Sequence, residues 1–305
     1  MGEAVTTIRG MSALTVAVTS SKGGVLKTSL VANVAGLAAA GGWRVLCVDA
    51  DPQGDLRHDL GYGDRSDHGR SLARGLLTGE RPTVLADVRP GLDVVAGGIA
   101  LRAAIDVLHD RGDTSRADAD VAGHDVLRHF GDYDLVLVDT PPGDVVLRRQ
   151  LTAHCAFSVV PTAPDAASMA GLVSIAEDLR AAVRINPHHE LLAVVLGPVG
   201  SGARDIRRAA RHRLSDLLDR PAPVLMATIR LAQKVAVDCR AAGQLVMEYE
   251  AAAAGADAPN GWRTRRDRRE YSSAASGLAA DYQELTDELL ERLVNRPLGG
   301  AFSAA

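Results

Sequence analysis

Short apolar runs alternate with longer stretches in which hydrophobic positions recur at helical spacing along most of this chain. This alternation is typical of α/β folds, in which buried parallel strands lie between layers of helices. The sequence therefore predicts a doubly wound, mostly parallel sheet with helices on both faces. The predicted strands are Leu14–Val18, Arg44–Asp49, Leu92–Ala96, Tyr133–Asp139, Ala156–Pro161, Leu191–Leu196 and Val224–Ile229. The predicted helices are Leu30–Ala40, Leu72–Leu77, Val121–Phe130, Ser168–Val183 and Asp281–Val294.

The pattern predicts a single domain over residues 14–295, with an N-terminal extension (1–13) and a C-terminal tail (296–305). Small residues from Ala251 onward predict a flexible insertion, residues 251–276, inside that domain. Its second part holds five arginines between Trp262 and Tyr271. Arginines beside aromatic rings suit phosphate gripping or base stacking. A solvated loop that only keeps the chain soluble has the same composition, so both interpretations stay open.

Composition limits the class of protein. The chain has 305 residues, of which 47% are hydrophobic and 24% charged, enough for one large core. Its formal net charge is −4, so any contact with nucleic acid must come from a local basic patch. Cys47, Cys155 and Cys239 lie in apolar or helical contexts, which predicts core residues in a reducing compartment. The absence of a signal-like N-terminus and of an apolar stretch of ~20 residues predicts a cytoplasmic protein with no membrane partner.

The loop between the first predicted strand and helix carries the first chemical signal. It runs from Ser20 to Ser29 and holds two of the three lysines around a Gly-Gly pair. A strand, a glycine-bearing turn, Lys-Thr and a helix cradle nucleotide phosphates, because backbone N–H groups and the helix N-terminus face the anion. The alternative is a basic loop that happens to contain two glycines. The predicted nucleotide-binding residues here are Lys22, Gly23, Gly24, Val25, Leu26, Lys27, Thr28 and Ser29.

Two downstream segments favour the phosphate-binding interpretation. Each follows an apolar strand and presents aspartate before a Pro-containing turn: Asp49-Ala50-Asp51-Pro52-Gln53-Gly54 and Asp139-Thr140-Pro141-Pro142-Gly143. Together with Lys-Gly-Gly-x-x-Lys-Thr at residues 22–28, they resemble the deviant Walker A ATPases of the ParA/MinD family.

The resemblance implies binding of ATP and Mg²⁺ and hydrolysis of ATP in a homodimer. It implies that Lys27 holds the β- and γ-phosphates, while Lys22 reaches the nucleotide of the other subunit. Asp51 would orient the attacking water, and Pro142 with Gly143 would begin the segment that senses the γ-phosphate. The implied catalytic residues are Lys22, Lys27 and Asp51, and the implied metal-site residues are Thr28, Asp51 and Asp139.

Leu26 and Ser21 depart from the general P-loop, which has glycine at both positions. Glycine before the P-loop lysine allows the backbone to approach phosphate without a Cβ in the way. A leucine there is expected to point outward, into the dimer interface, and to slow nucleotide-driven closure. The expectation is a functional but slow ATPase.

A basic segment follows the predicted strand Leu191–Leu196, where ParA-like ATPases carry nonspecific DNA contacts. At helical spacing its arginines form one stripe, which two later basic residues extend. An arginine-rich exposed helix face is also ordinary, so the resemblance is what favours double-stranded DNA as the partner. The predicted DNA-binding residues are Arg204, Arg207, Arg208, Arg211, Arg230 and Lys234. The predicted last helix is acidic and lacks the basic face that lets MinD-type helices lie on lipid.

The resemblance therefore implies a nucleoid-associated ATPase that partitions plasmid or chromosomal DNA. It would form an ATP-dependent sandwich dimer, and a ParB-like centromere-binding partner would stimulate its hydrolysis. Two other functions remain open at this point: a positioning ATPase for a non-DNA cargo, and a nucleotide-bound scaffold with little hydrolysis.

Overall fold

A single eight-stranded sheet forms the centre of the computed structural model, which describes residues 13–20, 22–24, 26–114, 122–200, 203–218, 223–256 and 272–296. The strands are β1 (Leu14–Val18), β2 (Val45–Asp49), β3 (Leu85–Arg89), β4 (Leu92–Val95), β5 (Leu135–Asp139), β6 (Phe157–Thr162), β7 (Glu190–Val199) and β8 (Val224–Arg230). The helices are α2 (Lys27–Ala40), α3 (Leu56–Leu60), α4 (Arg70–Thr78), α5 (Leu101–Thr114), α7 (Ala122–Leu127), α8 (Val145–Ala153), α9 (Ala166–Ile185), α10 (Ala203–Leu218), α11 (Gln233–Ala242), α12 (Val246–Ala256) and α13 (Ala275–Val294). Two 3₁₀ turns, η1 (Gly63–Arg65) and η2 (Arg128–Phe130), complete the described elements.

The strand order is β3-β4-β2-β5-β1-β6-β7-β8, and every pair is parallel except the edge pair β3–β4. The predicted doubly wound, mostly parallel sheet is therefore confirmed. β1 lies between β5 and β6, and β2 pairs with β5 so that Asp49 stands opposite Asp139. Parallel strands bring their carboxyl ends to one edge, where ligands of such sheets bind. The loop after β1 and the aspartates that end β2 and β5 thus meet at that edge.

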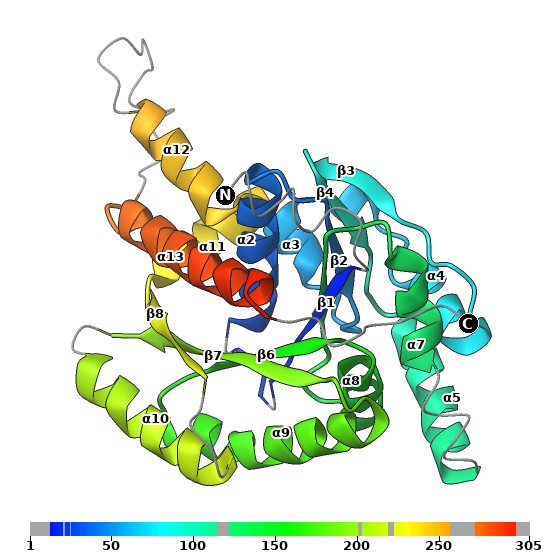
Figure 1. Ribbon diagram of the computed structural model, residues 1–305. Coiled ribbons are helices and arrows are strands. Elements are labelled where there is room, and N and C mark those ends of the chain that lie inside the picture. Colours follow the sequence, from blue (N-terminus) through cyan, green and yellow to red (C-terminus); the bar gives the residue numbers. More distant parts are fainter. Residues whose placement is uncertain are drawn as a thin grey trace.

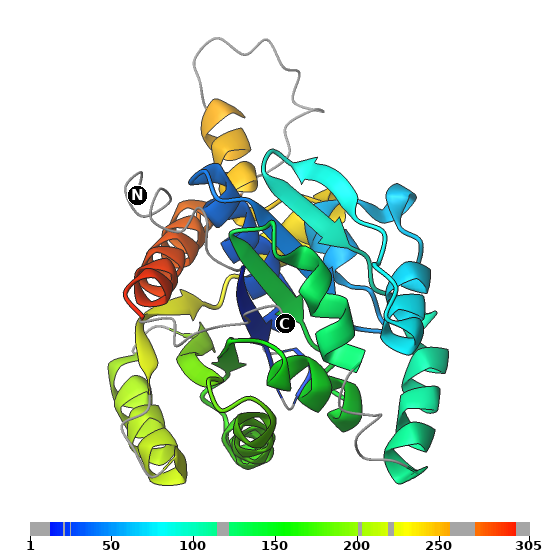
Figure 2. The same cartoon turned by 45° about the vertical axis from the view of Figure 1, so that its right-hand side comes forward.

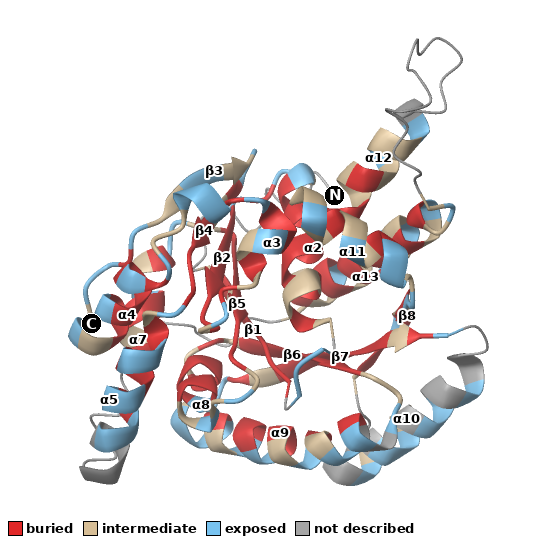
Figure 3. Cartoon of the chain, turned by 180° about the vertical axis from the view of Figure 1, so that it is seen from behind, coloured by how far each residue is buried: buried red, intermediate tan, exposed pale blue. Residues whose placement is uncertain are grey.

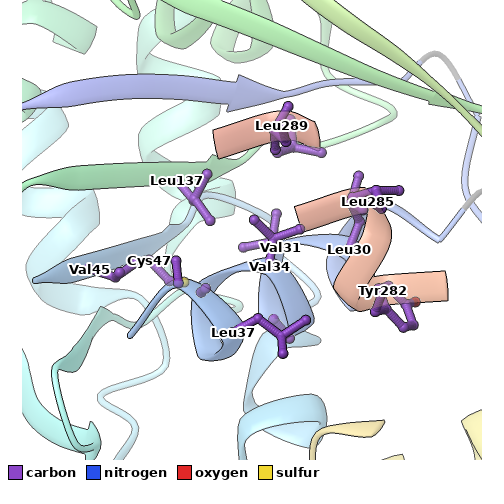
Figure 4. Close-up of a cluster of buried hydrophobic side chains, with 14 of the residues drawn as sticks. Leu30, Val31, Val34, Leu37, Val45, Cys47, Leu137, Tyr282, Leu285 and Leu289 are labelled. Carbon is purple, nitrogen blue, oxygen red and sulfur yellow. The ribbon is translucent and has the colours of Figure 1, made fainter. Parts of the chain in front are cut away.

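Helices cover both faces of the sheet (Figures 1 and 2). On one face α2 lies against the strands and α13 lies against α2, with α11 and α12 beside them. Figure 4 shows Leu30, Val31 and Val34 of α2 between strand residues such as Leu137 and α13 residues such as Leu285. On the other face α4, α5, α7 and α8 close a second apolar cluster, and α9 closes a third against β6 and β7. Figure 3 shows that α9 and α10 expose their outer sides.

Several elements extend beyond the sequence prediction. The first helix begins at Lys27 rather than Leu30, and the last begins at Ala275 rather than Asp281. Several elements were not predicted, among them β3 and α5; β3 is a short edge strand with half-buried and exposed side chains. The sequence analysis also treated Ala251 onward as flexible, whereas α12 continues to Ala256, as the high helix propensity of alanine favours. The rest of that segment through residue 271, the N-terminal extension to residue 12 and the tail from residue 297 lie outside the described residues.

None of the helices in the described part of the chain is long and apolar enough to cross a membrane. The three cysteines are all buried and free, as core residues should be.

Candidate functional site

The loop between β1 and α2 is held open by an unusual backbone conformation. Gly24 has φ +80° and Leu26 has φ +61°, so two residues of this short loop occupy the left-handed region. A Cβ added to Gly23 or Gly24 would meet nothing within 4 Å, so one side of the loop is clear of protein atoms. Ser20 donates its hydroxyl to the carbonyl of Lys22 at 3.0 Å and braces the turn. Ser21 and Val25 lie outside the described residues.

Lys27 and Thr28 converge on Asp139 at the carboxyl end of β5. The Lys27 ammonium forms an ion pair with Asp139 Oδ1, and the Thr28 hydroxyl donates to Asp139 Oδ2 at 2.8 Å. Lys27 is 6% exposed and Asp139 is fully buried. A buried charge is tolerated when it is paired and hydrogen-bonded, and Asp139 meets both conditions. Residues more than a hundred positions apart thus form one polar centre beneath the loop.

Asp49 and Asp51 stand beside this centre at the end of β2. Asp51 donates its backbone N–H to Asp49 Oδ1 at 3.1 Å, and Asp51 Oδ1 accepts the N–H of Gln53 at 2.9 Å. Burial raises the pKa of Asp51, and it raises the pKa of Asp49 much further with help from the neighbouring Asp139 charge. A Cβ on Gly97 would lie 2.4 Å from the Asp49 carbonyl, so only glycine fits there. Sequence analysis missed Gly97, although its place after a predicted strand was a signal.

Lys22 lies at the outer side of the loop with its side chain 54% exposed. Its ammonium is 3.9 Å from Asp165 Oδ1, the carboxylate that caps the N-terminus of α9 through the N–H of Ser168. Lys22, Ser20 and the first turns of α9 line a small pocket with the end of β6. Lys22 is therefore placed apart from Lys27, on the surface rather than in the buried centre.

The side chain of Leu26 does not point outward, and that expectation was wrong. Leu26 is half-buried and packs against the apolar core on the α2 face. Its Cδ1 lies 3.2 Å from the position that a Cβ on Gly197 of β7 would occupy. The physical reason is the left-handed backbone at Leu26, which directs the side chain toward the apolar core and away from the side of the loop where Gly23 and Gly24 are clear of protein atoms. Leu26 directly precedes α2, and its carbonyl accepts the N–H of Leu30 at 2.7 Å, the first hydrogen bond of the helix.

The segment after β5 is fixed to α9 by a buried arginine. Pro142 offers its carbonyl to Arg148 Nη1 at 2.8 Å, and the same guanidinium donates twice to Asp178 Oδ2. Arg149 donates to the second oxygen of Asp178 at 2.5 Å. A Cβ added to Gly143 would meet nothing within 4 Å, so the side of the turn where it would lie is clear of protein atoms. Sequence analysis did not identify Arg148, because its partner is thirty residues away.

A second polar group missed by the sequence analysis joins α2, α3 and α11. Ser29 donates to Asp59 Oδ1 at 2.8 Å, and Arg240 Nε lies 3.5 Å from Asp59 Oδ2. Asn33 accepts the N–H of Val246 at 2.9 Å, which ties α2 to the start of α12. Ser29 was predicted as a phosphate-loop residue, but its partners follow from long-range packing.

The predicted DNA-binding residues lie at the β8 end of the sheet, on α10, β8 and α11. Arg204 and Arg207 belong to α10, but their side chains fall outside the described part of the structure. Arg208 is exposed and lies 3.8 Å from Asp205, and Arg211 contacts Met226. Arg230 ends β8 and is held by Asp281 through three hydrogen bonds, while Lys234 lies in the first turn of α11.

The donor set fits nucleotide and magnesium. Mg²⁺ prefers oxygen ligands, and Thr28 Oγ1 and Asp139 supply a hydroxyl and a carboxylate that already touch. Phosphates bind helix N-termini beneath glycine turns, and the clear side of Gly23 and Gly24 leaves room for them.

The sequence of this chain matches a known protein family and several known proteins. A family model described as an AAA domain matches residues 13–190. The chromosome partitioning protein ParA of Caulobacter vibrioides is 34% identical over 185 residues, which cover 59% of this chain and 67% of that protein.

Solved structures give the same fold. The ATP complex of McdA from Cyanothece aligns over 95% of this chain and 99% of its own, with a TM-score of 0.70 and 15% identity. Cobyrinic acid a,c-diamide synthase from Mycobacterium smegmatis, solved with a bound ATP analog and magnesium, aligns over 79% of this chain and 97% of its own. Its TM-score is 0.60 and its identity 26%.

Proposed function

This chain belongs to the ParA-like partitioning and positioning ATPases of the AAA domain family, and on that premise we propose that it partitions DNA. It binds ATP with Mg²⁺, closes into a sandwich dimer and then holds double-stranded DNA without reading its sequence. A ParB-like partner on the cargo stimulates hydrolysis and releases the DNA, so the protein works at the nucleoid. The observation that carries the proposal is the meeting of Lys27, Thr28 and Asp139 beneath a loop that also presents Lys22.

Lys27 and Thr28 hold the substrate phosphates in this proposal. The Lys27 ammonium exchanges its Asp139 partner for β- and γ-phosphate oxygens, which keeps the buried charge paired throughout. Thr28 Oγ1 and Asp139 would hold Mg²⁺, which would supply positive charge next to the transferred phosphoryl group.

Asp51 positions the attacking water. Its Oδ1 is occupied by the N–H of Gln53, and its other oxygen has no hydrogen-bond partner among the described residues. Because burial raises the pKa of Asp51, its carboxylate accepts a hydrogen bond from water more strongly than an exposed aspartate does.

Lys22 acts across the dimer. Among the described residues its ammonium has only a long contact, with Asp165, and both side chains are about half exposed, so solvent screens the pair and separating them costs little. Free of that contact, Lys22 can approach the phosphates of the nucleotide in the other subunit.

The arginines of α10 are the DNA contacts of the proposal. A sandwich dimer brings two such helices onto one assembly, and each neutralised phosphate releases counterions, which makes binding sensitive to salt but blind to sequence. Arg230 is the weakest member of the set, because Asp281 already neutralises it.

Positioning of a non-DNA cargo is the second candidate function. Two observations favour it, because both weaken attraction to DNA: Asp281 neutralises Arg230, and the chain has a net charge of −4. The same nucleotide cycle then serves a cargo bound elsewhere on the dimer. In that case neutralising the α10 arginines leaves function intact.

Binding of nonspecific duplex DNA with ATP, with ADP and without nucleotide, at two salt concentrations, tests the proposal. We expect binding only with ATP, falling steeply with salt. Lys22→Ala should keep ATP binding yet lose the dimer and the DNA, because its ammonium acts on the partner's nucleotide.

The triple variant Arg204→Ala, Arg207→Ala, Arg208→Ala should keep the ATP-dependent dimer and bind DNA much more weakly. The slope of log K for DNA binding against log salt concentration should be reduced by ~0.9 for each lost phosphate contact. Arg184→Ala, which removes an exposed arginine of α9, is the matched control and should bind as the parent does. An ATP-dependent dimer that never binds DNA would establish the non-DNA candidate. A dimer that never releases phosphate, even with its partner, would identify a nucleotide-bound scaffold.

A further inference from the structure

Asp59 is a buried carboxylate next to the phosphate loop that the nucleotide cycle described above does not use. It lies in α3, the helix that begins just after the Asp51 turn, and its side chain is 7% exposed. Its Oδ1 accepts the hydroxyl of Ser29, two residues after Lys27, at 2.8 Å. Its Oδ2 is buried and has no hydrogen-bond donor among the described residues, where the Arg240 Nε at 3.5 Å is its ion-pair partner.

Arg240 connects Asp59 to α11. Its Nη2 also lies 3.3 Å from Asp55, so one arginine of α11 holds both acidic residues of the segment that follows the Asp51 turn. The backbones of α3 and α11 touch as well. Gly61 and Gly243, the left-handed residues that end the two helices, are so close that a Cβ on Gly243 would lie 2.6 Å from the Gly61 Cα.

Three segments therefore meet at one carboxylate: the start of α2, the helix after the Asp51 turn, and α11. We propose that Asp59 is a positioning residue that couples α11 to the phosphate loop through Ser29 and Arg240, so that nucleotide binding at the loop orders α11. The inference rests on the proposed nucleotide function. It adds a route from the phosphates to the C-terminal part of the chain.

A purely structural role for Asp59 fits the energetics poorly. Burial, the largest effect, raises the pKa of Asp59 to about 6 despite the hydrogen bond from Ser29 and the charge of Arg240. Asp139 from β5 and the nearby Asp55 add to the rise. An unfolded aspartate ionises near pH 3.8, so the folded state is penalised as the pH rises from there through 6. At neutral pH the ionised Asp59 therefore costs stability, which suits a residue kept for function.

Hydrogen exchange with a non-hydrolysable ATP analogue and Mg²⁺ tests the coupling without requiring hydrolysis or DNA. In the parent chain, nucleotide should slow exchange both at residues 27–33 and at residues 233–242. In Asp59→Asn the protection at 27–33 should remain, whereas protection at 233–242 should fall about fivefold, the scale of such couplings. The matched control is Asp55→Asn, which loses a contact with the same Arg240 but leaves Ser29 and Asp59 paired and should resemble the parent.

Measurements of unfolding in urea distinguish a positioning role for Asp59 from a purely structural one. Asp59→Asn should unfold at a higher urea concentration than the parent at pH 7.5, with the difference shrinking between pH 6 and 4 and vanishing below. Lower stability at pH 7.5 together with parallel loss of protection in both segments would show a merely structural residue.

Three other results overturn the inference, and they distinguish failure of the coupling from failure of the proposed function. Protection at 27–33 without any response at 233–242 in the parent, or an unchanged response in Asp59→Asn, removes the coupling and leaves the proposed function standing. No nucleotide response anywhere in the parent removes the proposed function and the coupling together.

Discussion

Leu26 shows how a residue that breaks a motif can keep the conformation of the motif. The general P-loop has glycine at this position, and Leu26 adopts φ +61°, a conformation that suits glycine. A leucine held there costs about 1–2 kcal/mol. The contact of its side chain with the core below β7 offsets part of that cost, because burying a leucine contributes about 1.5–3 kcal/mol when complete.

Replacing Leu26 tests this balance. Leu26→Gly should change the free energy of unfolding by less than about 1 kcal/mol, since relief of backbone strain and loss of packing cancel. Leu26→Val should destabilise the protein by more than about 1 kcal/mol, because a β-branched residue tolerates positive φ poorly. Urea unfolding at pH 7.5 measures both. A glycine variant that loses more than about 2 kcal/mol would mean that packing, and not the backbone, decides the choice of leucine.

At the scale of single residues, most of the candidate site was predicted from short local motifs. Lys27, Thr28 and Asp139 were assigned to one site from short segments, and the structure brings them into contact. The direction of the Leu26 side chain could not be predicted from the sequence, because it depends on whether the φ angle of this one residue is positive or negative. Asp59 and Arg240 are 181 positions apart, and no local pattern pairs them.

Among the elements, β8 has an edge that α13 closes with carboxylates. Glu288 accepts the backbone N–H groups of Met226, at 2.8 Å, and Ala227, at 3.1 Å. Asp281 accepts the N–H of Arg230 at 2.9 Å. An edge strand with unpaired N–H groups is a template for pairing with another chain, and these side chains occupy the groups instead.

Removing one of the carboxylates should expose the edge. Glu288→Ala should destabilise the protein by about 1–3 kcal/mol, since two backbone donors lose their partner, and should promote self-association. Thermal unfolding and light scattering measure the two effects. Glu291→Ala, which removes an exposed carboxylate of the same helix, should alter neither. Equal behaviour of both variants would show that water replaces Glu288 without consequence.

Element prediction succeeded where burial dictates the pattern. The strands β2, β5 and β6 are buried along their whole length, and their continuous apolar runs allowed them to be predicted from the sequence. β3 has half-buried and exposed side chains and pairs only with β4, so its sequence resembles a loop. The second half of α12, from Ala251 to Ala256, was predicted to be flexible because its small residues carry no amphipathic pattern, although alanine favours a helix.

At the scale of the whole molecule, the C-terminal helices complete a core begun by the first ones. Six large side chains of α13 are buried against the α2 face: Leu278, Tyr282, Leu285, Leu289, Leu290 and Leu293. The family match ends at residue 190, but the hydrophobic core that positions the phosphate loop does not.

A chain ending at Ala256 should therefore fail to fold stably. Each of the six side chains contributes about 1.5–3 kcal/mol, which sums to roughly 10 kcal/mol or more. The net stability of a domain is only about 5–15 kcal/mol. Far-UV and near-UV circular dichroism should show lost tertiary structure in this fragment. A chain ending at Arg296, which retains every described element, should fold as the parent does.

The position of α13 against α2 also has a consequence for synthesis. α2 leaves the ribosome early, but the helix that covers its apolar face begins at Ala275, more than two hundred residues later. At about 5–20 residues per second, the growing chain carries that face uncovered for on the order of ten seconds or more. Until α13 is made, other contacts, within the nascent chain or with a chaperone, must cover the apolar face of α2.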